Sequence, residues 1–247
     1  MDFTRMLGQD GYNSKTTGGS CILLRRCGGD GAVIHAARIC TGKTDIQSTD
    51  KLDQQLLEYM MIAKPRHGTP FEHATMCWEI TTPIFVARQL MRHRMGTFNE
   101  QSMRHTAGMG GFYTPTIDRI DPEGENSTDV NRENIKDYRH TMREAQTRYE
   151  MLVNDGCPRE VARGVLGTAT MTRLLWTVNC WSFLNWLEKR THNSAQEEHR
   201  ELATMAWLLW QTYMPMTAAA FYKKLRHGER RSSYESLALC DRPLDNE

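Results

Sequence analysis

The sequence lacks the features of a membrane protein, of a disulfide-bonded protein and of a zinc protein. No apolar run approaches the roughly 18 residues needed to span a bilayer. Residues 1–15 contain no apolar stretch of the kind found in secretory signals. The seven cysteines are scattered and include no CxxC pair. We therefore expect reduced thiols, a cytoplasmic location, no bound metal and no membrane partner.

A strong charge of either sign is also missing. The 247 residues carry 31 Lys and Arg against 30 Asp and Glu, a formal net charge of +1. Proteins that bind nucleic acid generally show a marked basic excess, so no nucleic-acid partner is expected. The length suits one sizeable domain and requires no second one, and we expect residues 1–247 to form a single domain.

The N-terminal half alternates between strand and helix patterns. Glycine-rich turns separate short apolar runs near the N-terminus, and residues 75–82 place every second apolar side chain on one face. After Pro83, which suits a first helical turn, apolar residues recur every three to four positions. The expected elements are strands at 21–24, 32–34 and 75–82, a helix capped near 48–50 that ends by Lys64, and a helix from Pro83 through His93.

The C-terminal half has helical spacing. A long amphipathic helix is expected over 135–152, ended by 155–156, and a short one begins at Pro158. The run 171–189 is apolar on nearly every side, which predicts a helix buried in the core or in a subunit interface. Further helices are expected at 195–213 and 218–225, and residues 108–111 and 115–125 are expected to form loops. The fold class is therefore α+β, with a helical C-terminal half packed on a small, mainly antiparallel sheet.

Polar and basic side chains concentrate between Arg88 and Arg104, where five of seventeen residues are Arg or His. Guanidinium groups bind phosphate bidentately, and Glu and Gln can recognise polar ring edges, so this segment could hold a phosphate and a base. The alternative is a solvated basic helix followed by a polar loop. The side chains expected to converge are Gln89, Arg92 and His93 on one helix face, and Glu100, Ser102 and Arg104 on one side of an extended chain.

These motifs resemble those of the flavin-dependent thymidylate synthases. Arg92-His93-Arg94, seven residues and then Ser102 match the RHR-x7-S signature of that family. Several other blocks match in the same order, and the resemblance covers about residues 33–200. The other matching blocks are 67–73, 83–89, 99–104, 158–163 and 176–179, then Arg190 followed by 195–196.

The resemblance implies reductive methylation at C5 of a uracil nucleotide, UMP or dUMP. In this family NADPH reduces FAD, methylenetetrahydrofolate supplies the one-carbon unit, and the flavin delivers a hydride. No protein nucleophile is used, so no cysteine needs a catalytic role and Ser102 is a binding hydroxyl. The resemblance also implies a homotetramer whose active sites are built across subunits.

Matching positions carry residue roles over to this chain. Arg190, Glu100 and Ser102 are the expected catalytic residues, and Arg190 would stabilise negative charge that develops on the uracil ring. The expected nucleotide-binding residues are Gln89, Arg92, Glu100, Gln101, Ser102, Met103, Arg104, His105, Arg163 and Arg190. The expected FAD-binding residues are His67, Thr69, Glu72, Arg92, His93, Arg94, Asn99, Asn179 and Asn185.

Four departures from the family pattern matter. Met103 and Thr97 replace a small residue and a serine, and Cys180-Trp181 stands where the family commonly has Ala-Arg, which removes an expected flavin contact. His105 replaces a tyrosine beside the sugar. A smaller His could admit and hydrogen-bond a 2′-hydroxyl, which predicts acceptance of UMP as well as dUMP.

That substrate range is similar to the uracil-nucleotide methylases of polyoxin-type antibiotic pathways. Two alternatives stay open at this point. One is an ordinary dUMP-specific thymidylate synthase in which His105 has no effect. The other is an inactive nucleotide- or RNA-binding homologue that has lost flavin through Trp181.

Overall fold

The computed structural model describes residues 3–6, 10–44, 49–227 and 237. Its centre is an antiparallel six-stranded sheet with strand order β1-β2-β3-β4-β6-β5. The α+β prediction, with an antiparallel sheet and a helical C-terminal half, is confirmed. The strands are β1 (Phe3–Arg5), β2 (Gly11–Ser14), β3 (Ser20–Cys27), β4 (Thr75–Pro83), β5 (Gly96–Glu100) and β6 (Met171–Asn179).

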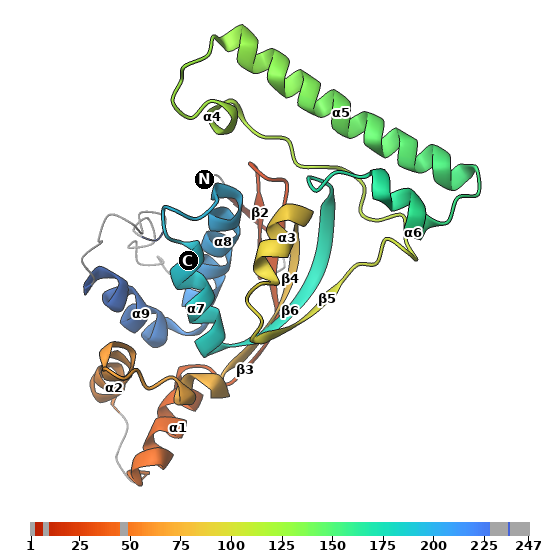
Figure 1. Ribbon diagram of the computed structural model, residues 1–247. Helices are drawn as coiled ribbons and strands as arrows, with labels where there is room; N and C mark the ends of the chain where they lie inside the picture. The colour runs from red at the N-terminus through yellow and green to blue at the C-terminus, as the bar shows by residue number, and fades with distance from the viewer. Residues whose placement is uncertain (1–2, 7–9, 45–48, 228–236, 238–247) are drawn as a thin grey trace.

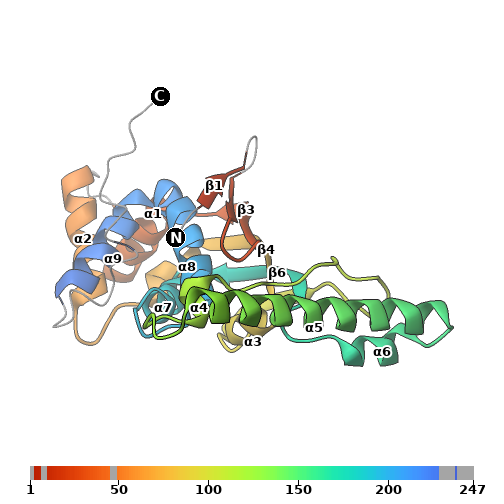
Figure 2. The same cartoon turned by 90° about the horizontal axis from the view of Figure 1, so that it is seen from above.

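The helices lie in two regions around this sheet. Figure 1 shows α1, α2, α7, α8 and α9 gathered together, whereas α5 stands apart, with the chain between β5 and α4 running beneath it. Seen from above, α5 runs along one side of the molecule from α4 to α6 (Figure 2). The helices are α1 (Asp30–Thr41), α2 (Asp50–Ile62), α3 (Ile84–Leu90), α4 (Ile117–Ile120), α5 (Thr128–Asn154), α6 (Arg159–Ala162), α7 (Cys180–Arg190), α8 (Glu197–Tyr213) and α9 (Pro215–His227), with 3-10 turns η1 (Thr69–His73) and η2 (Arg163–Val165).

The core forms on the face of β4 and β6 that packs against the helices. Trp78 on β4 lies opposite Trp176 on β6. Phe183 of α7 stacks on Trp78 with ring centroids 5.4 Å apart, and Trp176 meets Trp186 edge-on at 5.0 Å. All four aromatic side chains are buried. Aromatic pairs of this geometry add stabilisation beyond the apolar area that they bury.

Most predicted elements are confirmed with shifted ends. Thr49 caps α2 by accepting a hydrogen bond from the Leu52 N–H at 3.4 Å; Ser48 lies outside the described residues. The strand predicted at 75–82 is β4, with Met76, Trp78 and Ile80 buried as expected. The helices predicted at 135–152, from 158, at 195–213 and at 218–225 correspond to α5, α6, α8 and α9.

Three expectations are wrong. Residues 32–34 belong to α1, because the glycine turn at 28–29 leads straight into a helix. Residues 117–120 form a short helix, α4, where loop was expected. Pro83 ends β4 and precedes the helix as its cap, and α3 stops at Leu90, so the helix does not extend through His93.

The run 171–189 is a strand followed by a helix, β6 and α7. Exposed and buried residues alternate along β6, but its exposed positions include Leu175, so the strand carries apolar groups on both faces. A short apolar run of this kind cannot be told from a helix by periodicity. Of the two places expected for this run, the core and a subunit interface, the core holds Trp176 and Trp186, since both are buried within the chain.

The chain turns directly after α3 and approaches β6 closely as it enters β5. A Cβ at Gly96 would lie 2.6 Å from the indole nitrogen of Trp176, so only glycine allows the chain to enter β5 here. The N–H of Arg92 donates to the carbonyl of Gln89 at 3.3 Å, and that of His93 to Leu90 at 3.0 Å. These turns reverse the chain before the strand begins.

Two kinds of feature are absent from the described residues. No helix there combines the length and apolarity that crossing a bilayer requires. No group of three or more His, Cys, Asp or Glu side chains is placed there to hold a metal ion.

Candidate active site

A connected set of polar side chains lies where α3 and α7 both meet α8 (Figure 1). Arg190 Nε donates to His93 Nε2 at 3.0 Å, and Arg190 Nη1 to Gln89 Oε1 at 3.5 Å. Gln89 Oε1 also lies 3.2 Å from His199 Nδ1. Trp186 Nε1 donates to His199 Nε2 at 3.0 Å. Three of the residues predicted from the sequence, Gln89, His93 and Arg190, are therefore in direct contact.

Both histidines of this set are neutral at physiological pH. Burial, followed by the positive charges of Arg190 and Lys189, lowers the pKa of His93 to about 4. Burial, then Arg190 and His93, holds the pKa of the fully buried His199 well below its ordinary value. The positive charge of the connected set therefore rests on Arg190, whose position in the last turn of α7 also suits the helix dipole.

Ser102 and Arg104 lie past the end of β5, in a turn. The N–H of His105 donates to the carbonyl of Ser102 at 3.3 Å. Arg104 Nε donates to Glu160 Oε2 at 3.1 Å, in an ion pair whose side chains are each 54% exposed. The expectation of an extended chain with Glu100, Ser102 and Arg104 on one side is wrong, because pairing with β6 ends at Glu100.

The other residues predicted to bind the nucleotide differ in their hydrogen-bond partners and in their exposure to solvent. Glu100 Oε1 accepts a hydrogen bond from Thr172 Oγ1 at 2.7 Å. The side-chain oxygen of Gln101 is buried without a partner in the described part of the chain. Arg163, on η2, is exposed. His105 is exposed and Met103 is half-buried.

Several of the residues predicted to bind FAD lie in the turn before η1 and at the start of α7. Gly68, between His67 and Thr69, packs against Trp181, since a Cβ at Gly68 would lie 2.5 Å from Cε2 of that indole. Trp181 also stacks on Phe71, with ring centroids 6.0 Å apart. The indole thus packs beside this turn at the position where an arginine is common in the family.

Other members of the predicted FAD set line the same region. Asn179 caps α7, its Oδ1 accepting from the Ser182 N–H at 2.8 Å, and its NH₂ group has no partner among the described residues. Asn185 Nδ2 donates to the carbonyl of Trp181 at 3.1 Å. His67 stacks on Tyr59 with ring centroids 5.7 Å apart. Four further members of the predicted set are exposed: Glu72, Arg92, Arg94 and Asn99.

The predicted nucleotide-binding residues fall into two groups at opposite ends of β5. The α7 group is Gln89, Arg92 and Arg190, and the α6 group is residues 100–105 with Arg163. A five-residue strand spans roughly 15 Å, and Figure 1 shows α6 and α7 at opposite ends of the sheet. One chain therefore does not bring the two groups together.

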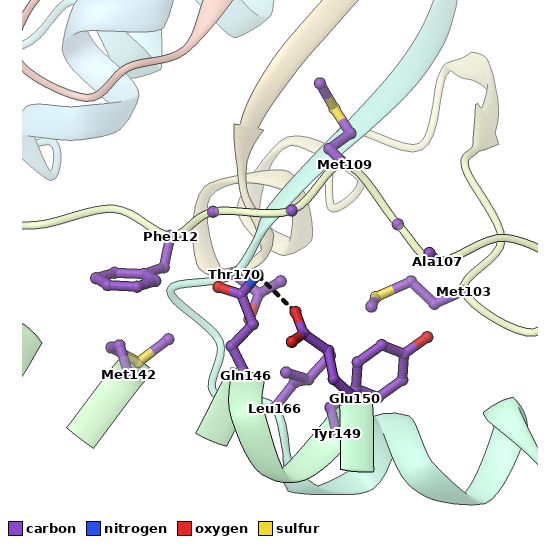
Figure 3. A pocket seen from close by; sticks show the side chains of 13 residues that line it. Met103, Ala107, Met109, Phe112, Met142, Gln146, Tyr149, Glu150, Leu166 and Thr170 are labelled. Carbon is purple, nitrogen blue, oxygen red and sulfur yellow. Dashed lines mark hydrogen bonds between the residues drawn. The ribbon is translucent and has the colours of Figure 1, made fainter. Parts of the chain in front are cut away.

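A cavity of about 300 Å³ lies between the chain at 103–112 and α5 (Figure 3). Met103 and Met142 line it, and Gln146 Nε2 donates to Glu150 Oε1 at its edge, at 3.4 Å. Tyr149, 5% exposed, also lines it, and its hydroxyl has no partner within the described ranges. The cavity adjoins the α6 group, and Met142 and Tyr149 were identifiable from the sequence only as part of an apolar helix stripe.

His199 and Trp186 were not predicted as site residues. An isolated histidine in a helical segment carries no local signal, and Trp186 was interpreted as part of an apolar helix. His199 is connected to the site by its contact with Gln89, and Trp186 by its hydrogen bond to His199.

Comparisons with known proteins agree on the family. Residues 22–216 match the Thy1 family, described as thymidylate synthase complementing protein. A flavin-dependent thymidylate synthase from Pseudothermotoga lettingae is 33% identical over 207 residues, 84% of this chain and 91% of the relative. One from Thermotoga neapolitana is 35% identical over 204 residues, 82% of this chain and 90% of the relative.

Solved structures agree as well. The UMP/dUMP methylase PolB from Streptomyces cacaoi bound with 5-Br dUMP superposes with a TM-score of 0.77 at 31% identity, covering 84% of this chain and 96% of that one. The same methylase bound with 5-Br UMP gives a TM-score of 0.73 with the same identity and coverage. The family match, the shared fold and the RHR-x7-S motif together show that this chain belongs to the Thy1 family, that of the flavin-dependent thymidylate synthases.

Proposed function

We propose that this protein methylates C5 of a uracil nucleotide, with UMP accepted as well as dUMP, and uses FAD, NADPH and methylenetetrahydrofolate. The observation that carries the proposal is the Arg190 guanidinium held between His93 and Gln89. Similarity to a methylase solved with both bromo-nucleotides supports the choice of substrates.

Arg190 would face the uracil ring. Of Arg190, His93 and His199, the arginine carries the positive charge, because both histidines are neutral. A fixed cation stabilises negative charge that develops on the ring during reduction, at no cost in reorganisation. Gln89 would bind a polar edge of the same ring, and Arg92 would add a further contact to the nucleotide.

The α6 group would bind the phosphate and sugar. Ser102, Arg104 and Arg163 offer one hydroxyl and two guanidinium forks, with Gln101 and Met103 in the same turn. Glu100 would accept a hydrogen bond from the nucleotide beside its bond from Thr172. His105, exposed in this turn, would lie beside the sugar and determine whether a 2′-hydroxyl is tolerated.

The region around η1 and the start of α7 fits FAD in its chemistry. Arg92 and Arg94 are exposed and unpaired with any acidic group of the described residues, so they can meet the cofactor's pyrophosphate. His67, Thr69, Glu72, His93, Asn99, Asn179 and Asn185 would hold its remaining polar groups. When bound, FAD supplies the hydride chemistry that protein side chains lack.

Cys180, in the first turn of α7, is unsuited to nucleophilic attack. Cys180 follows Asn179 directly and is fully buried. Burial, and then Asp30, raises the pKa of its thiol, so the reactive thiolate is not formed. The described cysteines are free thiols, which suits a cytoplasmic protein. A mechanism without a protein nucleophile is consistent with these facts.

We further propose that the active site is completed by a second copy of the chain, within a homotetramer. The α6 and α7 groups lie too far apart in one chain for a single nucleotide. Apolar side chains are also exposed around α5, α6 and η2: Val130, Met151, Val161 and Val165. Contact between copies would cover them and bring the α6 group of one copy to the α7 group of another.

The test is an assay of the purified protein with FAD, NADPH and methylenetetrahydrofolate, in which UMP and dUMP are offered separately and the product nucleotide is identified by mass. Methylation of both supports the proposal. Methylation of dUMP alone would make the protein a plain thymidylate synthase. Methylation of neither, in protein that retains flavin, would refute the proposed reaction.

A further inference from the structure

A continuous hydrogen-bonded chain runs from the buried core to the proposed uracil site. It passes from Trp186 to His199 (3.0 Å), from His199 to Gln89 (3.2 Å) and from Gln89 to Arg190 (3.5 Å). Gln89 Nε2 also donates to Gln196 Oε1. Trp186 and His199 are fully buried, so neither can touch a ligand.

The two ends of this chain can only donate, and this determines every group between them. An indole N–H has no acceptor function, so His199 Nε2 must accept and carry no proton. A buried neutral histidine then has its proton on Nδ1, and this N–H donates to Gln89 Oε1. The guanidinium of Arg190 likewise requires an acceptor, and Gln89 Oε1 is again the atom that faces it.

The amide of Gln89 is therefore held in one orientation. Its oxygen accepts from both His199 and Arg190 and has no lone pair left. Its nitrogen uses one N–H on Gln196, and the second N–H has no partner among the described residues. Gln89 can thus offer a ligand a donor and not an acceptor.

We infer that His199, with Trp186, is a positioning residue that orients the Gln89 amide so that its remaining N–H donates to a carbonyl oxygen of the bound uracil. This inference rests on the proposed function, since it assumes a uracil nucleotide beside Gln89 and Arg190. The same orientation keeps an acceptor on Arg190 and so helps to hold its guanidinium in place.

The Trp186–His199 contact is more than a way of satisfying a buried indole. The indole nitrogens of Trp78, Trp176, Trp207 and Trp210 are buried without partners in the described part of the chain. This core therefore tolerates unpaired indole N–H groups. The indole of Trp186, in contrast to those four, is bonded to a histidine that reaches the site. Trp210 offers a matched control.

The test measures binding of nucleotides to the FAD-loaded protein by calorimetry. Uracil nucleotides are compared with their 2-thio and 4-thio analogues, because sulfur is a much weaker acceptor than oxygen. Wild-type protein should lose about tenfold in affinity when the contacted carbonyl becomes a thiocarbonyl. Trp186→Phe and His199→Leu should bind the ordinary nucleotide about three- to tenfold more weakly and lose most of the thio penalty.

Two variants separate positioning from damage to the core. Trp210→Phe should keep both the affinity and the thio penalty of the wild type. His199→Gln should restore them at least in part, because an amide can accept from Trp186 with its oxygen and donate to Gln89 with its nitrogen. If His199→Leu fails to fold, Trp186→Phe and His199→Gln still decide the matter.

The possible outcomes distinguish failure of the positioning role from failure of the proposed function. A thio penalty that is equal in wild type and Trp186→Phe would overturn the inference, as would the absence of any penalty at either carbonyl in wild type. In both cases normal binding of UMP or dUMP would leave the proposed function standing. If flavin-loaded wild type binds neither nucleotide, the proposed function fails, and this inference fails with it.

Discussion

The contact between Gly68 and Trp181 yields a prediction whose magnitude follows from the structure. In Gly68→Ala the new Cβ would lie 2.5 Å from Cε2 and 2.8 Å from Cδ2 and Cζ2 of the indole. Carbon atoms pack best at about 3.5–4.0 Å, so the groups must separate by roughly 1 Å. The backbone of Gly68 has φ −80° and ψ −33°, which alanine adopts freely, so the cost is steric alone.

The indole also stacks on the fully buried Phe71, with ring centroids 6.0 Å apart, and this contact restricts its movement. Overpacking of this kind costs about 1–3 kcal/mol. For a chain of this length that lowers Tm by roughly 2–12 °C. The displaced turn carries His67 and Thr69, so FAD retention should weaken as well.

Thermal unfolding at a fixed protein concentration measures the first effect, and flavin absorbance after gel filtration measures the second. Gly31→Ala is the matched control, since a Cβ there meets no atom within 4 Å and should leave Tm unchanged or slightly higher. In a Trp181→Leu background, Gly68→Ala should cost little. A loss of Tm that is equal in both backgrounds, or no loss in either, would refute the reasoning.

Three further predictions concern the site. His105→Tyr should shift the ratio of kcat/KM values by about tenfold or more toward dUMP, as measured with both nucleotides; an unchanged ratio would show that His105 does not contact the sugar. His93 titrates near 6.5 when unfolded and at about 4 when folded, so the unfolded chain binds more protons between these values and Tm should fall as pH drops from about 6.5 to about 4. His93→Asn should lessen that fall in Tm and leave the part due to His199. The control, His140→Asn on the exposed surface of α5, should leave the fall unchanged. Equal plots of Tm against pH for wild type and His93→Asn would contradict the burial of His93. Cys180→Ala should keep kcat within about threefold of wild type, whereas loss of all turnover in folded protein would point to a nucleophilic thiol.

The local sequence pattern was enough to predict a helix or strand where the burial of its residues follows a simple period. Alternation identified β4 because Met76, Trp78 and Ile80 face one core. The spacing of three and four identified α5, and Thr49 marked the start of α2 through its capping hydroxyl. The RHR-x7-S motif predicted the family, since several ordered blocks of matching residues rarely occur by chance. The assignments of individual residues to nucleotide and FAD remain predictions.

The sequence by itself thus determined the family, the α+β class and the set of side chains available for chemistry. Tertiary structure alone decided that 171–179 is a strand, because apolar groups on both faces conceal the period of two. It alone placed His199 on Gln89, 110 residues earlier in the chain, and packed Trp181 against Gly68. Contacts over such separations depend on how whole elements dock, and no local spacing of residues records that docking.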